Sequence, residues 1–289
     1  MQASVIILIR QKGSDLQVYL LKRNPLSGFM PGNYVFPGGT LDLEDRDFGF
    51  WKAHVDMDSG EISGRLGGDL AVEDVLASSI AAIRETFEEA GVFLGLRGER
   101  TKGELKRLCK VRGAGHLTKG WLKEYVTAAE RVIRVSGLAR WSHWITPKES
   151  SKRFDARFFV AFMPEDQECA PDKRETTQGI WISPEQGLDE NLRGNIPLSP
   201  PTVVTLNELL KYPNLNDLTE NVETRPWGKA REPRLITLAQ GVLILLPWDP
   251  MYNQGGEIDT GALKTKLLPS GAPFSRILYN KGLWRPVGN

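Results

Sequence analysis

Residues 84–92 read Arg-Glu-Thr-Phe-Glu-Glu-Ala-Gly-Val, and this stretch constrains the fold and the chemistry of the chain more than any other. On a helix, the carboxylates of Glu85, Glu88 and Glu89 share one face because they are spaced i, i+3 and i+4. The opposite face carries an apolar stripe, made by Leu76, Ile80, Ile83 and Phe87. The pattern predicts a helix over about 72–90 that packs on a core with one face and presents acid to a cleft with the other.

Three carboxylates on one helix face repel one another unless a positive charge lies among them. Hard divalent cations such as Mg²⁺ or Mn²⁺ take oxygen ligands of this kind. Arg84 is four residues before Glu88 and can orient that carboxylate through a charge-assisted hydrogen bond. The alternative interpretation is a solvated acidic face with an ordinary surface ion pair.

The stretch Arg-Glu-x-x-Glu-Glu-x-Gly resembles the second half of the Nudix box, Gly-x5-Glu-x7-Arg-Glu-(apolar)-x-Glu-Glu-x-Gly-(apolar). Phe36-Pro37-Gly38-Gly39 supplies the glycine loop of the first half. Gly39 and Arg84 are 45 positions apart where the box has 14, so about 31 residues are inserted. Leu76 stands where the box has its first Glu. The residues that could replace that Glu are Asp42, Asp45 and Glu73.

The resemblance to Nudix hydrolases implies an α/β fold, an α/β/α sandwich with a mixed sheet, extended by helical inserts. We expect a Nudix domain over 1–196, with an insertion at about 43–71 and a helical insert at about 96–136. A C-terminal extension, 197–289, is expected to pack on this domain.

Hydrophobic periodicity and turn residues locate the remaining elements. The expected strands are 3–10, 17–23, 34–36, 139–146, 154–163 and 180–183. The expected helices cover 103–112, 118–135, a segment starting at Pro184 and 202–211. After these, the pattern predicts a polar linker over 212–230, a hairpin over 235–246 and a strand-bearing tail.

Within the family, the chain resembles the peroxisomal coenzyme A diphosphatase branch, the nucleoside diphosphate-linked moiety X motif 19 type. The matching stretches are 81–92, 141–147, 153–155 with 158–159, and 200–202, and that branch also splits its box. The resemblance implies hydrolysis of coenzyme A or acyl-coenzyme A to 3′,5′-ADP and (acyl-)phosphopantetheine.

The substrate stays open, because only half of the signature that coenzyme A-directed members carry before the box is present. Leu20-Leu21 and Gly32-x3-Phe36-Pro37-Gly38-Gly39 match it, whereas Lys22, Pro25 and Gly28 do not. The alternatives are an ADP-sugar or dinucleotide pyrophosphatase, a non-catalytic Nudix-like binding or regulatory module, and a scaffold that uses its acidic helix for partner contact.

By resemblance, the metal ligands are Glu85, Glu88, Glu89 and the carbonyl of Gly38. The catalytic residues are Arg84, Glu85 and Glu175, the last as general base or extra ligand. Glu175 lies six residues before Trp181, ahead of a strand, and a surface loop acid is an equal interpretation. If Glu175 has no role, the base must be sought at Glu85 or Glu168.

The cations that could bind the 3′-phosphate of coenzyme A are Lys22, Arg23, Arg153 and Arg157. The alternative interpretation is that these side chains are solvated or form salt bridges. The insertion that carries Trp51 and the helix over 118–135 could wall a channel for the pantetheine arm. Trp141 and Trp144 could stack on adenine, although aromatic residues at strand spacing more often fill a core.

Composition narrows the class of protein further. The chain has 289 residues and a formal charge of +1, which argues against a nucleic-acid or membrane footprint. Two cysteines and three scattered histidines argue against a zinc site. No signal peptide, 18-residue apolar run or C-terminal Ser-Lys-Leu is present. From composition we therefore expect a cytoplasmic protein, and the resemblance implies an enzyme with a small-molecule nucleotide substrate. A homodimer contact through the tail stays open.

Overall fold

The computed structural model describes residues 1–95, 101–128, 131–253, 260 and 263–288. Its centre is a seven-stranded mixed sheet in the order β3-β2-β1-β6-β5, with β4 paired to β1 and β7 paired to β2. These strands are β1 (Gln2–Lys12), β2 (Asp15–Arg23), β3 (Tyr34–Val35), β4 (Gly38–Thr40), β5 (Ala139–Ile145), β6 (Asp155–Phe162) and β7 (Thr176–Ile182). Only β1 and β6 are parallel among these pairs, from Gln2 opposite Asp155 to Ile9 opposite Phe162.

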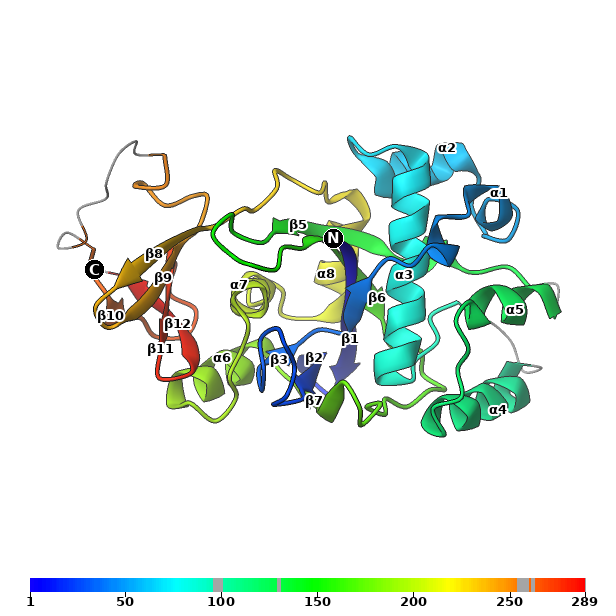
Figure 1. The fold of residues 1–289 in the computed structure, drawn as a ribbon, viewed down its shortest axis with the longest axis horizontal. Coiled ribbons are helices and arrows are strands. Elements are labelled where there is room, and N and C mark those ends of the chain that lie inside the picture. Colours follow the sequence, from blue (N-terminus) through cyan, green and yellow to red (C-terminus); the bar gives the residue numbers. More distant parts are fainter. Residues whose placement is uncertain (96–100, 129–130, 254–259, 261–262, 289) are drawn as a thin grey trace.

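Alternate side chains of β1 separate two apolar cores. Ile6 and Leu8 point into the α3-side core, which α3 (Val72–Ala90) covers. Ile7 and Ile9 point into the α7-side core, which is covered by α6 (Pro184–Arg193), α7 (Pro200–Leu209) and α8 (Leu215–Thr224). Figure 1 shows α3 on one side of β1 and β6, and α7 and α8 on the other. The predicted α/β/α sandwich with a mixed sheet is confirmed.

The acid-bearing helix forms over the predicted residues. All four side chains of its apolar stripe are buried: Leu76, Ile80, Ile83 and Phe87. The helix ends at Gly91, which adopts a left-handed φ of 73° and donates its backbone N–H to the carbonyl of Phe87. Since the stripe packs against β1, the opposite face of the helix is held toward the glycine loop.

The insertion between the glycine loop and α3 is folded. It contains η1 (Glu44–Arg46), α1 (Phe48–Trp51), α2 (Ser59–Ile62) and η2 (Ser63–Gly67). Asp58 and Glu61 form a reciprocal capping box at the start of α2. Trp51, Ile62 and Leu66 enter the α3-side core, so the insertion thickens that core.

The second insert carries α4 (Thr101–Gly113) and α5 (Trp121–Ala128). The predicted helix over 118–135 is too long, because residues 131–134 are not helical and η3 (Val135–Gly137) follows them. Ile133 instead turns into the α3-side core, and its backbone N–H donates to the carbonyl of His54 at 2.7 Å. Residues 96–100 and 129–130 of this insert lie outside the described part of the chain.

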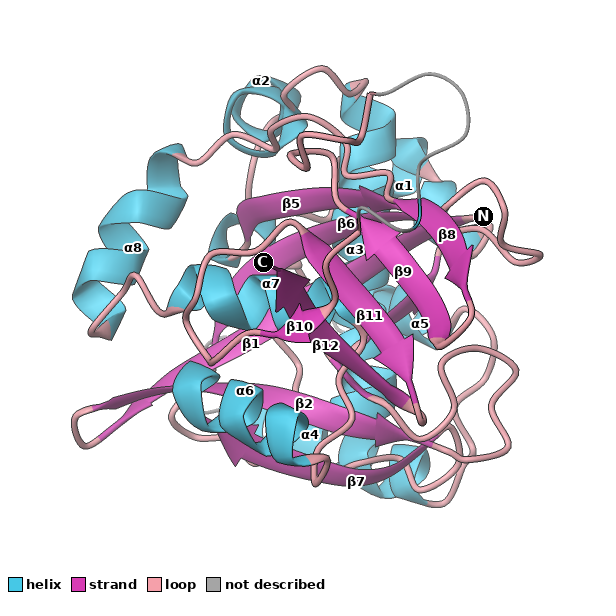
Figure 2. Ribbon diagram, turned by 90° about the vertical axis from the view of Figure 1, so that its left-hand side faces the viewer, coloured by secondary structure: helices cyan, strands magenta, loops and turns pink. Residues whose placement is uncertain are grey.

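The C-terminal part forms a second, antiparallel sheet in the order β10-β12-β11-β9-β8, and Figure 2 shows β8, β9 and β11 side by side. Its strands are β8 (Arg234–Leu238), β9 (Gly241–Leu245), β10 (Lys266–Leu267), β11 (Arg276–Asn280) and β12 (Leu283–Gly288). The predicted hairpin over 235–246 is therefore confirmed as β8 and β9. Ile244, Ile277 and Trp284 belong to the α7-side core, where this sheet meets the helices.

The polar linker predicted over 212–230 is wrong, because α8 occupies much of it. Leu218 and Val222 are four residues apart and fill the α7-side core, while the Asn214 side chain caps the helix start by accepting from the backbone N–H of Asp217. Leu215 packs partly against the same core, so a few apolar residues in an otherwise polar stretch hold this helix, and they give only a weak periodic pattern in the sequence. Among the described residues, no helix combines the length and apolar character needed to cross a membrane.

Candidate active site

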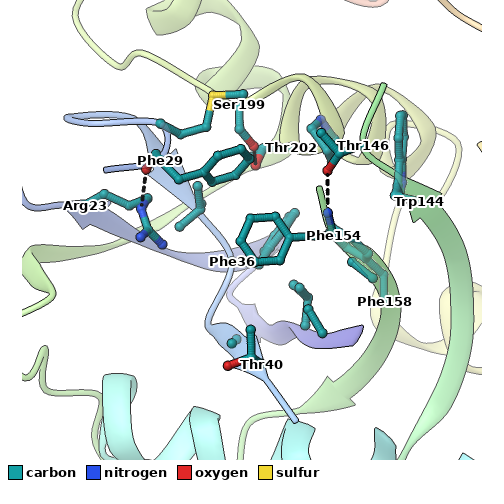
Figure 3. A pocket seen from close by; sticks show the side chains of 18 of the residues that line it. Arg23, Phe29, Phe36, Thr40, Trp144, Thr146, Phe154, Phe158, Ser199 and Thr202 are labelled. Atoms are coloured by element: carbon teal, nitrogen blue, oxygen red, sulfur yellow. Dashed lines mark hydrogen bonds between the residues drawn. The ribbon is translucent and has the colours of Figure 1, made fainter. Parts of the chain in front are cut away.

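A pocket of about 510 Å³ opens where the glycine loop, the acidic face of α3 and the C-terminal part meet. One end is lined by acidic side chains, which include Glu85, Glu88, Glu89 and Glu175. The rest of the wall is largely apolar. Figure 3 shows Phe29, Phe36 and Phe154 around this space, with Thr40 at the end nearest α3. The pocket therefore joins a charged end to an apolar one.

The two glycines of the loop each permit a close approach. A Cβ on Gly38 would lie 2.3 Å from the carbonyl oxygen of Ser4, so glycine lets β4 pair with β1. A Cβ on Gly39 would lie 2.4 Å from the Glu85 carboxylate. The backbone N–H of Gly38 donates to Glu89 Oε2 at 2.8 Å. The glycine loop therefore lies in close contact with two of the three helix acids, Glu85 and Glu89.

Arg84 links the acids of the pocket. Its Nη1 donates to Glu85 Oε1 and to Glu88 Oε2, each at 3.0 Å. Its Nη2 donates to the carbonyl of Thr40 at 2.9 Å. The Arg84 side chain is buried, and it holds two carboxylates and the loop in one arrangement.

Of the three acids that could replace the first Glu of the box, Asp45 forms a buried contact with Arg84. Arg84 donates from Nε to Asp45 Oδ1 at 3.0 Å and from Nη2 to Oδ2 at 2.8 Å, a bidentate pair. Asp45 is 2 % exposed. Asp42 lies 4.0 Å from Arg84 with a side chain that is 43 % exposed, and Leu76 fills the core. The sequence named Asp45 among three candidates but could not choose, because the choice depends on how η1 folds back on α3.

Burial dominates the electrostatics of the helix acids. It raises the pKa of Glu85 to about 7, against the opposing charge of Arg84. Burial also raises the pKa of Glu88, and burial together with the charge of Glu85 raises the pKa of Glu89. For Arg84, burial lowers the pKa, but the hydrogen bond to Asp45 and the acidic neighbours outweigh it and raise the pKa. A nearby cation strongly stabilises the charged form of a carboxylate whose pKa is raised by burial.

The helical insert supports the acidic face from outside the pocket. Trp121 of α5 donates its indole N–H to Glu88 Oε1 at 2.5 Å and packs its ring on Phe87, with centroids 5.0 Å apart. Arg112 of α4 donates to the carbonyls of Glu88 and Glu89 at 2.8 and 2.9 Å. No sequence motif marked either contact, because each joins residues more than 20 positions apart in the sequence.

Glu175 lines the pocket at the start of β7, on a loop with a defined conformation. The Asp172 side chain accepts backbone N–H groups from Arg174, Glu175 and Thr176. The backbone N–H of Asn24 donates to the Glu175 carbonyl at 2.9 Å. Glu168, the alternative acid, is exposed and lies outside the set of pocket-lining residues.

Of the four cations predicted to bind substrate, only Arg23 lines the pocket, and it donates to the Phe29 carbonyl and the Ser27 hydroxyl. Lys22 lies over the ring of Tyr34. Arg153 pairs with Glu232 at 2.6 Å, and Arg157 lies over the ring of Trp227. Lys152, which the sequence analysis did not single out, also lines the pocket.

The structure places Trp51 in the core instead of the pocket. It is 1 % exposed, and its indole N–H donates to the carbonyl of Glu44 at 2.8 Å. An aromatic ring with a satisfied N–H is more stable buried than exposed to solvent. Trp141 is likewise buried in the α7-side core, whereas Trp144 lines the pocket.

Within the described residues, no three acidic, histidine or cysteine side chains converge as a ready-made ion site. Nη1 of Arg84 instead binds one oxygen from each of Glu85 and Glu88. The donor set still fits a hard divalent cation. Glu85, Glu88 and Glu89 offer oxygens only, they line one end of one pocket, and their raised pKa values favour a neighbouring positive charge.

Comparisons with known proteins agree with this geometry. Residues 3–209 match the family model of the NUDT19 Nudix domain. The chain is 26 % identical to the acyl-coenzyme A diphosphatase NUDT19 of Xenopus laevis and 27 % identical to that of Homo sapiens. Each match covers 93 % of this chain and 82 % of the relative.

A solved structure supports the fold. The NUDIX hydrolase from Alicyclobacillus acidocaldarius superposes with a TM-score of 0.60 and 24 % identity, covering 78 % of this chain and 97 % of that one. The family model spans well over half of the chain, so it shows the family as well as the fold. The chain belongs to the Nudix hydrolases of the NUDT19 type, and it is a Nudix diphosphatase.

Proposed function

We propose that this enzyme hydrolyses the diphosphate of coenzyme A and of its acyl thioesters, giving 3′,5′-ADP and phosphopantetheine or acyl-phosphopantetheine. The observation that carries the proposal is the pocket itself, which joins an acidic end built on α3 to an apolar end. Coenzyme A has the same two-part character, a charged diphosphate and a largely neutral arm. The names of the relatives point to the same substrate class.

Nudix hydrolases generally use divalent metal ions, and we propose Mg²⁺ or Mn²⁺ here. Glu85, Glu88, Glu89 and the carbonyl of Gly38 would hold the ion. When bound, it would neutralise phosphate oxygens and lower the pKa of a coordinated water. Arg84 would keep Glu85 and Glu88 oriented through the hydrogen bonds already described.

The reaction needs a base, and we assign that role to Glu175. Its carboxylate lines the pocket within electrostatic range of Glu85 and Glu89, and the loop that carries it is held by Asp172 and Asn24. Glu175 would accept a proton from the attacking water as its oxygen bonds to phosphorus. The phosphoanhydride P–O bond then breaks, and the bridging oxygen leaves with one of the two phosphate products.

The decisive assay incubates the protein with Mg²⁺ or Mn²⁺ and a panel of coenzyme A, acyl-coenzyme A, ADP-ribose, NADH, nucleoside triphosphates and dinucleoside polyphosphates. We expect the highest kcat/KM for coenzyme A or its thioesters, with 3′,5′-ADP as a product. A preference for ADP-ribose or a dinucleotide would keep the Nudix chemistry and reject the coenzyme A assignment. Hydrolysis of none of these compounds would reject the enzyme itself.

The 3′-phosphate offers a sharper test of the substrate. Arg23 lies at the pocket wall and interacts electrostatically with Glu89, so it can place a cation next to a nucleotide bound at the acidic end. Charged hydrogen-bonded pairs of this kind contribute ~1.5–3 kcal/mol. We therefore expect dephospho-coenzyme A to have a kcat/KM at least roughly tenfold lower than coenzyme A.

Arg23→Gln should remove most of that discrimination, and Lys152→Gln serves as the matched control at the same pocket. Equal kcat/KM values for the two substrates in the wild type would show that no 3′-phosphate contact exists. The diphosphatase activity could then belong to an ADP-sugar or dinucleotide substrate.

A further inference from the structure

The apolar end of the pocket is completed by residues from outside the family's domain. The family model ends at residue 209, yet Pro233 and Ile244 line the pocket together with Phe154 and Phe158 of the central sheet region. Ile244 lies on β9 and is 4 % exposed, and Pro233 is buried just before β8. The second sheet therefore supplies part of the wall of the active-site pocket.

Specific contacts hold that sheet at the pocket rim. The backbone of Arg231 pairs with β5, since its N–H donates to the His143 carbonyl at 2.8 Å and its carbonyl accepts from Ile145 at 3.0 Å. The next residue, Glu232, forms an ion pair with Arg153 at 2.6 Å. Pro233 follows directly and is thereby fixed against the rim. Backbone pairing with β5 therefore fixes the position of this part of the pocket wall.

The chemistry of this end differs from that of the acidic end. Figure 3 shows Arg23 on one side of the pocket and Trp144 and Phe158 on the other. Phe29 and Phe154 meet edge to face across it, with ring centroids 5.0 Å apart. Lys152 also lines the pocket, with its Nζ 5.4 Å from the centroid of the Phe154 ring. Arg23 and the carboxylates occupy the other side, so the aromatic side can accommodate the neutral part of a bound substrate.

We propose that Pro233 and Ile244, with Phe154, form a subsite for the hydrocarbon chain of an acyl thioester, so that the second sheet sets the chain-length preference. This inference rests on the proposed function, because it places the diphosphate at the helix acids. An apolar wall contributes to binding roughly in proportion to the hydrocarbon area it covers. A longer chain therefore gains more from this wall than coenzyme A itself does.

The test compares kcat/KM for coenzyme A, acetyl-, hexanoyl- and dodecanoyl-coenzyme A in the wild type and in Ile244→Ala. Leu243→Ala is the matched control, because Leu243 is the adjacent residue of β9 and packs in the separate core on the other face of the sheet. We expect the dodecanoyl-to-coenzyme A ratio to fall by roughly tenfold in Ile244→Ala, the scale of one or two lost methylene contacts. Leu243→Ala should leave that ratio unchanged.

Phe154→Leu provides a second variant at a partly exposed position, in case truncation inside β9 prevents folding. It should lower the same ratio. An unchanged dodecanoyl-to-coenzyme A ratio in the folded variants would overturn the subsite. An equal loss of kcat/KM for coenzyme A and for every thioester would also overturn it, and would indicate that these residues bind adenine instead. A wild-type enzyme that hydrolyses no member of the series would instead refute the proposed function.

Discussion

The buried pair of Asp45 and Arg84 makes a quantitative prediction for Asp45→Asn. The amide keeps the shape of the side chain but removes its charge, and Arg84, which is 5 % exposed, loses a buried anionic partner. Breaking a buried ion pair by removing one partner destabilises a protein by about 3–5 kcal/mol. Glu85 and Glu88 continue to neutralise Arg84, which argues for the lower end, about 3 kcal/mol.

The expected shift in melting temperature follows from chain length. An unfolding entropy of about 2.1 cal/mol/K per residue, taken over 289 residues, gives roughly 0.6 kcal/mol/K. A loss of about 3 kcal/mol then lowers the Tm by about 5 °C. Thermal melts followed by circular dichroism at pH 7 can resolve this shift readily.

Asp42→Asn is the matched control, because Asp42 lies 4.0 Å from the same guanidinium with a side chain that is 43 % exposed. Exposed ion pairs contribute about 0–1 kcal/mol, so this variant should melt within about 2 °C of the wild type. The two variants should also differ in activity. In Asp45→Asn, Arg84 loses its contact with Asp45 and can move Glu85 and Glu88 out of position, which should lower kcat by roughly tenfold or more. Equal melting temperatures for Asp45→Asn and Asp42→Asn would refute the assignment of Asp45 as the buried partner.

Three further variants test other parts of the structure. Glu88→Gln should lower kcat by at least ~10²-fold while the fold persists, and near-normal turnover would show that this helix face does not bind the metal. Glu175→Gln should lower kcat by ~10²–10⁴-fold with unchanged Mn²⁺ affinity, whereas rescue by excess Mn²⁺ would identify Glu175 as a metal ligand. Trp121→Phe keeps an aromatic ring beside Phe87 but loses the indole hydrogen bond to Glu88, so direct Mn²⁺ titration of the folded variant should show an affinity at least ~10-fold weaker.

A fifth prediction concerns acid stability, through the Asp249–Arg276 ion pair at 2.7 Å. Burial alone would raise the pKa of Asp249, but hydrogen bonds from Arg276 and Ser275 outweigh it, and the pKa is lowered. A lowered folded-state pKa stabilises the protein above the unfolded value of about 4, and this stabilisation is lost as the pH falls through the folded pKa. Asp249→Asn should therefore lower the Tm at pH 7, and the difference should begin to shrink below about pH 4; a difference that stays at full size as the pH falls below about 4 would contradict the argument.

The helix over 72–90 was predictable because its apolar stripe reflects burial of one face. The strand β1 was predictable because its continuous apolar run reflects burial on both faces of the sheet. The catalytic half of the box was equally readable, since Glu85, Glu88 and Glu89 are close in sequence and share a helix face. The short strand β4 was predicted only as a turn, because its pairing with β1 depends on glycines that allow a close approach.

Contacts between distant segments were not predictable from one sequence. Asp45 is 39 residues from Arg84, and Trp121 is 33 residues from Glu88. Pro233 and Ile244 reach the pocket from another sheet, so no local pattern marks them. Trp51 illustrates the opposite error, because an aromatic residue in a polar insertion resembles a ligand contact until its burial is known.

The parallel pairing of β1 with β6 has a consequence for folding during synthesis. Gln2 pairs with Asp155, so roughly 150 residues must be translated before β1 can gain this neighbour. At about 5–20 residues per second, that interval lasts on the order of 8–30 s. Until then β1 can pair with β2 and β4, which are translated early, but its edge that faces β6 stays unpaired. That edge runs along the apolar residues Val5, Ile6, Ile7, Leu8 and Ile9. We therefore expect nascent chains shorter than about 160 residues to bind chaperones that recognise hydrophobic segments, and release to follow completion of β6.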